Sequence, residues 1–258
     1  MRETFFAVLV LGLVVLVPLP MTNVKSVLGM TSPISPPIRA TSVKTAVVLS
    51  SLEQVFPMGQ YGTDIVYYLT HAGYQVTELT NTQVTVNFLL TQLDNYSIVV
   101  WRTNTYTWKH VEYWYVGQLD TPAIESQYSS DFGNGYMNGN AGILGVNLNF
   151  FTEHFTSGVL SNVLLMIVIA TDSDSFAETL LNAGAGTVIF ANGAVDLSFG
   201  QVDDLTTQVV AALCTGQNVY DAVYNVVSPY IQNSNPEDPL DSSYTPPFWY
   251  EGNGTLTI

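Results

Sequence analysis

The chain has 258 residues, of which 47% are hydrophobic and 10% charged, and its formal net charge at pH 7 is −15. Residues 45–258 contain only Arg102 and Lys109 as cations, against 20 acidic residues. Nucleic acid and anionic membrane surfaces both require clustered cations, so the composition excludes both as partners. The high apolar content also excludes a disordered polyanion.

The N-terminus predicts an export segment. Residues 1–20 contain one early cation, Arg2, followed by an apolar run from Phe5 to Pro20. This run is longer than the apolar region of a typical signal peptide, which has ~7–15 residues, and shorter than a membrane-spanning helix, which needs ~20. We therefore predict that residues 1–30 are a signal peptide or a retained N-terminal anchor; a buried core helix is a third alternative. The chain would then be extracellular or anchored on the outer face of the cytoplasmic membrane.

A linker and an α/β domain follow. Residues 31–42 contain three prolines, which predict an extended linker. From there the apolar pattern alternates between short β-rich runs and stretches of helical spacing. The predicted strands span residues 45–50, 74–80, 97–103, 163–170 and 187–192. The predicted helices span residues 61–72, a segment capped by Thr82, then 147–155, 176–183, 202–213 and 218–227.

Residues 104–160 interrupt this alternation and predict an insertion with a hairpin. Its aromatic residues form either a carbohydrate- or partner-binding face or a hairpin that packs over the sheet edge: Tyr106, Trp108, Tyr113, Trp114 and Tyr115. The segment 133–142 (GNGYMNGNAG) lacks the lysine and the following helix of a phosphate loop, so we predict a flexible loop. In the C-terminal tail, residues 229–258, the last four residues are predicted to pair at a sheet edge.

Strands that are apolar throughout and alternate with helices predict a three-layer α/β/α sandwich with a mostly parallel sheet. Right-handed crossovers bring the carboxyl ends of such strands to one edge, where ligands bind. The predicted cleft is lined by Ser50, Ser51, residues 102–105, residues 171–175, Asn192 and Gly193. The predicted domain spans residues 43–228.

The order of these segments resembles the caspase-like fold of clan CD cysteine peptidases, with gingipain-like and CHAT-type members as the nearest branches. The resemblance covers residues 45–227. Its most specific part is residues 163–195, where a strand, a loop, a helix, an Ala-Gly-Ala turn and a second strand precede Asn192 and Gly193. The resemblance implies a catalytic His after the strand at 97–103 and a nucleophilic Cys after the strand at 163–170.

Both catalytic residue types are replaced at the corresponding positions. Asn104 stands at the position of the His, and Thr171 at that of the Cys. A thiolate is the nucleophile of these enzymes and the His is its base, whereas an amide cannot accept that proton. Cys214 is predicted to lie on the apolar side of a helix. The sequence therefore predicts a pseudo-peptidase.

Two charged groups near the predicted cleft have alternative interpretations. Arg102 either forms an ion pair with an acidic residue such as Asp172 or clamps a ligand carboxylate. Asp172, Asp174 and Glu178 are solvated acids near a helix N-terminus, a cation site, or part of a ligand site. Their spacing resembles part of a calcium loop, but the glycine and the final glutamate of that loop are missing. We therefore expect no cofactor, with calcium as the weak alternative.

The sequence thus predicts an exported, catalytically inactive caspase-like domain. It would act as a binding or cell-envelope-associated protein, with an extracellular protein, peptide or glycan as its partner. The first alternative is a divergent hydrolase or peptidase that uses Thr171 or Ser173 with Asp172. The second is a structural surface-layer component, which suits the cation-poor composition.

Overall fold

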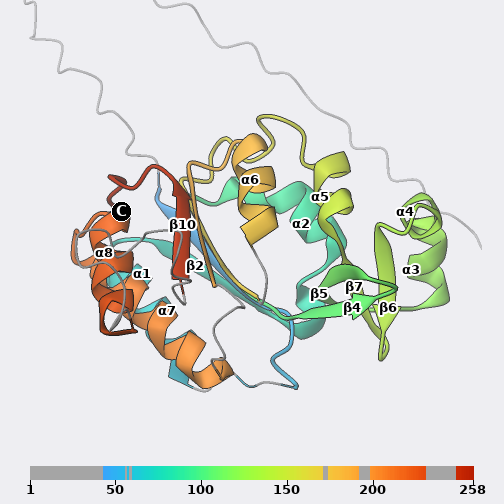
Figure 1. The fold of residues 1–258 in the computed structure, drawn as a ribbon, viewed down its shortest axis with the longest axis horizontal. Coiled ribbons are helices and arrows are strands. Elements are labelled where there is room, and N and C mark those ends of the chain that lie inside the picture. The colour runs from blue at the N-terminus through green and yellow to red at the C-terminus, as the bar shows by residue number, and fades with distance from the viewer. Residues whose placement is uncertain (1–42, 56, 58–59, 171–173, 192–197, 231–247) are drawn as a thin grey trace, which may run out of the picture. The chain divides into compact units, whose positions relative to one another are not determined.

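The computed structural model describes residues 43–55, 57, 60–170, 174–191, 198–230 and 248–258. These residues form a six-stranded sheet with helices on both faces and a second, four-stranded sheet, all within one compact unit (Figure 1). Residues 1–42, with the predicted export segment and linker, lie outside the described residues. Within the described part of the chain, no helix is long and apolar enough to cross a membrane.

The larger sheet has the strand order β10-β9-β8-β3-β1-β2. Its strands are β1 (Thr45–Ser50), β2 (Gln75–Thr80), β3 (Ile98–Arg102), β8 (Leu165–Ile169), β9 (Thr187–Ala191) and β10 (Phe248–Gly252). All neighbouring strands are parallel except β10, which is antiparallel to β9 at one edge. Every residue of β3, β8 and β9 is buried, because helices cover both faces of these strands.

Helices form the two outer layers. One face packs against α1 (Gln60–His71), α7 (Phe199–Cys214) and α8 (Val219–Val227). The other packs against α2 (Val86–Gln92), α5 (Leu148–His154) and α6 (Asp174–Asn182). Successive strand residues alternate between these two cores; Val100, for example, faces the first core and Trp101 the second. The predicted three-layer α/β/α sandwich is confirmed.

The region between β3 and α5 forms an antiparallel sheet of order β4-β5-β7-β6. Its elements are β4 (Thr105–Trp108), β5 (Val111–Leu119), α3 (Pro122–Gln127), α4 (Ser129–Gly133), β6 (Met137–Asn140) and β7 (Ile143–Val146). One face of this sheet belongs to the main core, because Trp114 contacts the rings of Trp101, Phe151 and Phe176. The second sheet is thus a fixed part of the domain.

Three local predictions are wrong. Residues 133–142 are not a flexible loop, since β6 lies within them and pairs with β7. Hydrogen bonding to the β7 backbone holds β6 as a strand although its Asn and Gly residues have low strand propensity. The C-terminal edge strand is β10, not residues 255–258; β10 has the larger apolar side chains, and Phe248 is fully buried. The second helix is capped by Thr85 rather than Thr82.

Thr85 is the better cap because its hydroxyl oxygen accepts a hydrogen bond from the Phe88 amide at 3.0 Å. Thr82 lies instead in the 3₁₀ helix η1 (Asn81–Gln83). Two further 3₁₀ helices, η2 (Leu93–Asn95) and η3 (Ser228–Tyr230), follow α2 and α8.

Candidate functional site

The carboxyl ends of β1, β3 and β8 meet at one edge of the larger sheet. Ser50 pairs in register with Arg102, and Arg102 with Ile169. Beyond the strands, the Ser51 amide donates to the Arg102 carbonyl at 3.1 Å, and the Thr103 amide to the Ile169 carbonyl at 2.9 Å. The predicted cleft residues at the ends of β1 and β3 are therefore adjacent, and residues 50–51 and 102–103 are buried.

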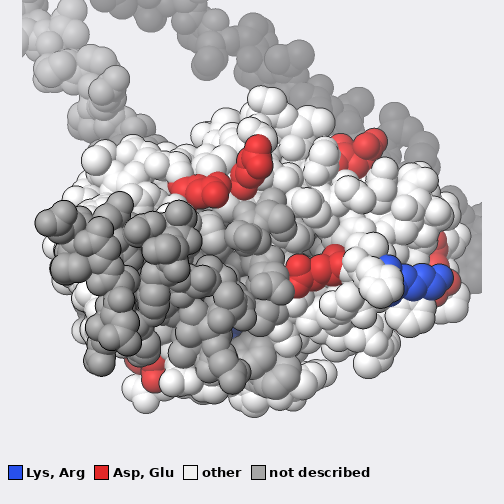
Figure 2. Space-filling view, in the orientation of Figure 1, with Lys and Arg blue, Asp and Glu red and all other residues white. Residues whose placement is uncertain are grey.

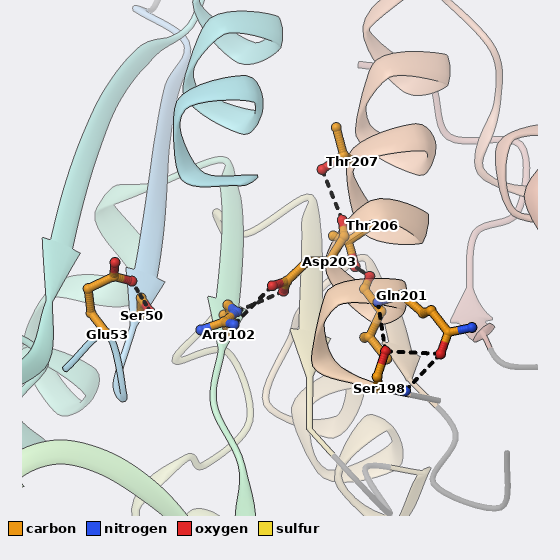
Figure 3. Close-up of polar contacts among 9 residues, drawn as sticks. Ser50, Glu53, Arg102, Ser198, Gln201, Asp203, Thr206 and Thr207 are labelled. Carbon is orange, nitrogen blue, oxygen red and sulfur yellow. Dashed lines mark hydrogen bonds and ion pairs between the residues drawn. The ribbon is translucent and has the colours of Figure 1, made fainter. Parts of the chain in front are cut away.

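Arg102 forms an ion pair across this edge. Its Nε donates to Oδ1 of Asp203 at 2.7 Å, and its Nη2 to Oδ2 at 2.9 Å (Figure 3). Asp203 lies in the first turns of α7, whose N-terminus is fixed by a capping box between Ser198 and Gln201. Sequence reasoning missed Asp203, although a helix antiparallel to the strands must begin at this same edge.

The ion pair lies near the Tyr61 ring and near further acidic side chains. The guanidinium carbon of Arg102 lies 5.9 Å from the centroid of the Tyr61 ring, and the Tyr61 hydroxyl is buried without a hydrogen-bond partner. Burial raises the pKa of Asp203, with smaller contributions from the charges of Asp204 and Glu53, and this outweighs the lowering effect of Arg102. Burial also raises the pKa of Tyr61. The site therefore disfavours additional negative charge.

Asn104 is the second residue after β3 and is half-buried. Its carbonyl accepts a hydrogen bond from the Tyr115 amide at 3.0 Å, which extends the pairing of β4 with β5 to this residue. The position that the resemblance assigns to a catalytic His thus carries an amide, at the junction between the two sheets. An amide has no basic nitrogen to accept a proton from a nucleophile.

Three predicted site residues lie outside the described residues: Thr171, Asp172 and Asn192. Asp174 is the first residue of α6, and Glu178 is exposed on the same helix. Among the described residues, no three His, Cys, Asp or Glu side chains are grouped so as to hold a metal ion.

The Cys and His side chains of the chain do not form a dyad at the sheet edge. Cys214 is the last residue of α7, about 11 residues and therefore roughly 16 Å along the helix from Asp203. His154 is paired with Asp131, with its Nε2 2.8 Å from Oδ1 of the carboxylate. His110 lies in the exposed turn between β4 and β5.

The aromatic residues of the insertion divide into two sets. Trp114 is buried and belongs to the core. The opposite face of the second sheet carries the buried Tyr113, whose ring stacks with that of Tyr106, and the half-buried Tyr106 and Tyr115. Trp108 is 49% exposed. The predicted hairpin is present, and only part of the aromatic cluster faces outward.

A search of solved structures gives the fold. The structure is similar to that of the Arg-specific cysteine proteinase gingipain R, with a TM-score of 0.51 and 12% sequence identity. The match covers 84% of this chain and 49% of the proteinase, so the chain corresponds to about half of that protein. The chain has a caspase-like fold. At this identity the likeness shows the fold alone.

The other comparisons add little to the caspase-like fold. A short-chain flavodoxin associated with a bacterial microcompartment matches with a TM-score of 0.27 and 15% identity, over 55% of this chain and 76% of the flavodoxin. A Geobacter sulfurreducens protein matches with a TM-score of 0.38 and 10% identity, over 81% of this chain and 94% of that protein. Neither score carries an argument. No family model and no curated protein matches the sequence.

Proposed function

We propose that this chain is an exported, catalytically inactive caspase-like domain that acts as an extracellular binding or cell-envelope-associated protein. Asn104 carries the proposal: it follows β3 at the position of the family's catalytic His. The chain has a single cysteine, Cys214, and its helix position is at the opposite end of α7 from the Arg102–Asp203 pair. A thiolate with an adjacent base is required for this class of peptide cleavage.

Electrostatics favours the same interpretation. Burial raises the pKa of the Cys214 thiol to about 11, although the nearby Lys44 lowers it somewhat. A thiol with this pKa is protonated at neutral pH and is a poor nucleophile.

On the face seen in Figure 2, acidic side chains are scattered rather than gathered into one patch. This distribution suits a soluble extracellular binding domain better than a protein that attracts a polycation.

The experiment is a peptidase assay of the purified chain without residues 1–41, since the compact unit begins at residue 42. Peptide libraries and unfolded protein substrates are incubated with it between pH 4 and pH 9. We expect no turnover by wild type and none by Cys214→Ala. Turnover that Thr171→Ala abolishes would instead establish the divergent hydrolase that uses Thr171 with Asp172.

Export is tested separately. Fractionation of the source cells, with mass spectrometry of the N-terminus, is expected to find the chain outside the cytoplasmic membrane. A mass lacking about the first 30 residues identifies a cleaved signal, and the full mass in the membrane fraction identifies an anchor. A chain found in the cytoplasm would contradict the proposal. Ordered self-association of the secreted protein would favour the structural surface-layer component.

A further inference from the structure

The second sheet has an outward face that the core does not use. Side chains alternate along its strands, so the residues next to the buried Trp114, Val116 and Val146 point the other way. The register places Tyr115 beside Gly145, and Gly145 beside Asn138. We call this the tyrosine–amide face; it comprises Asn104, Tyr106, Tyr113, Tyr115, Asn138 and Asn140.

Tyr106 spans this face from β4 to β6. Its ring centroid lies 4.7 Å from that of Tyr115, and its hydroxyl donates to the Asn138 carbonyl at 2.8 Å. Its path crosses Gly145: a Cβ there would lie 2.6 Å from the Tyr106 hydroxyl oxygen. The glycine is therefore required for the ring to lie in this position, and the two rings are held in one fixed arrangement.

Polar groups flank the two rings. The Asn140 side-chain amide donates to the Tyr115 hydroxyl at 2.6 Å, so the hydroxyl retains its own proton for donation. The Asp120 carboxylate lies on the other side of this sheet, over Gly139, which pairs with the core residue Leu144. Burial raises the pKa of Tyr106, with smaller contributions from Tyr115, Tyr113 and Asp120. The amides and hydroxyls of the face are thus close together.

The face is accessible and joins the sheet edge. Tyr106, Tyr115, Asn138 and Asn140 are each half-buried, so part of each of these side chains meets solvent. Asn104 lies opposite Tyr115 in the extended pairing of β4 with β5, and paired residues in an antiparallel sheet point to the same side. The face therefore continues to the position of the missing catalytic His.

We propose that the tyrosine–amide face binds a neutral saccharide; this inference rests on the proposed binding function and names the ligand class. A sugar ring has an apolar C–H face that packs on tyrosine and hydroxyl edges that both donate and accept hydrogen bonds. Amide side chains offer both functions, and the tyrosine hydroxyls add further donors and acceptors, which suits vicinal hydroxyls. The face itself has no cation, and the chain is strongly acidic, so uronic or sulfated glycans are disfavoured.

The test is native affinity electrophoresis of residues 42–258 in gels that contain laminarin, dextran, mannan or galactan. We expect at least one of these polysaccharides to retard the wild-type protein. Tyr115→Ala and Asn140→Ala are expected to weaken binding about tenfold, which corresponds to ~1.4 kcal/mol. Gly145→Ala is expected to do the same by displacing Tyr106 without altering a surface side chain.

Two exposed tyrosines elsewhere provide matched controls: Tyr67→Ala on α1 and Tyr220→Ala on α8 should bind as wild type does. Circular dichroism checks the fold of each variant, and Tyr115→Phe, which loses only the hydroxyl, replaces any Tyr115→Ala protein that does not fold. No retardation in any gel, or equal retardation of wild type, Asn140→Ala and the Tyr115 variant, would overturn the inference. The peptidase assay decides the proposed lack of activity independently, so the two proposals can fail separately.

Discussion

Arg102 and Asp203 are 101 positions apart in the sequence, yet they form a bidentate ion pair with side chains that are 3% and 10% exposed. The pair joins the end of β3 to the first turns of α7 (Figure 3). Two donors of the guanidinium are therefore committed to a protein carboxylate. This makes Arg102 a structural element of the sheet edge and argues against its use as a clamp for a ligand carboxylate.

Removing one member of this pair should be costly. Asp203→Ala removes the bidentate carboxylate from the buried Arg102, and Arg102→Met removes the guanidinium from the buried Asp203. We expect either change to cost about 3–5 kcal/mol in the free energy of unfolding. The double variant Arg102→Met with Asp203→Leu should recover most of that loss, because no charge remains to be desolvated. Urea unfolding followed by circular dichroism measures all three, with the exposed Glu178→Gln as control. A double variant no more stable than either single variant would contradict this account.

The pH dependence of stability follows from the burial of Asp203. Its pKa in the folded state is raised above its ordinary value of 3.8, so the folded state holds the proton more tightly than the unfolded chain does. The resulting stabilisation is complete below pH 3.8 and is lost as the pH rises through the folded-state pKa. Repulsion among the excess acidic groups acts in the same direction. We expect the Tm to be higher at pH 4 than at pH 8 in low salt.

Asp203→Asn separates the two contributions. It removes the titrating group and should flatten the fall in Tm just above pH 4, whereas added salt should reduce the fall over the whole range. Differential scanning calorimetry at half-unit pH steps gives both profiles. A wild-type Tm that climbs steadily from pH 4 to pH 8 would refute the prediction.

The raised pKa of Cys214 predicts slow thiol chemistry. A rise from 9.0 to about 11 lowers the thiolate fraction at pH 8 about 100-fold. We therefore expect the native protein to react with a disulfide reagent at least tenfold more slowly than the urea-unfolded chain, which serves as the control. Equal rates in the two states would show that the thiol is neither buried nor perturbed, and would reopen the question of a reactive cysteine.

The sequence predicted the larger sheet well, because strands covered on both faces are almost entirely apolar: β8 is apolar at every position and β9 at all but Thr187. It predicted the second sheet poorly. β6 and β7 have four residues each, and β6 (MNGN) carries little intrinsic strand preference, so its conformation depends on pairing with β7. The partner of Arg102 was also missed: the topology brings the start of α7 to the same edge, but no local pattern singles out Asp203, 101 residues later.

The turn between β4 and β5 predicts a stabilising substitution. Lys109 and His110 join Trp108 to Val111 with φ angles of 49° and 66°, a left-handed conformation that costs a side-chain-bearing residue roughly 1–2 kcal/mol. Two-residue hairpins favour Asn-Gly in this conformation. The variant Lys109→Asn with His110→Gly also loses the contact of the Lys109 ammonium, 5.6 Å from the Trp108 ring centroid, which contributes ~0.5–1 kcal/mol. After this loss is subtracted, the variant should be more stable than wild type by about 1 kcal/mol.

Urea unfolding measures the gain. Lys109→Ala, which loses the same contact but keeps the strain, is the control and should be slightly less stable than wild type. If the Asn-Gly variant is also less stable, the turn residues are not strained as their backbone angles indicate.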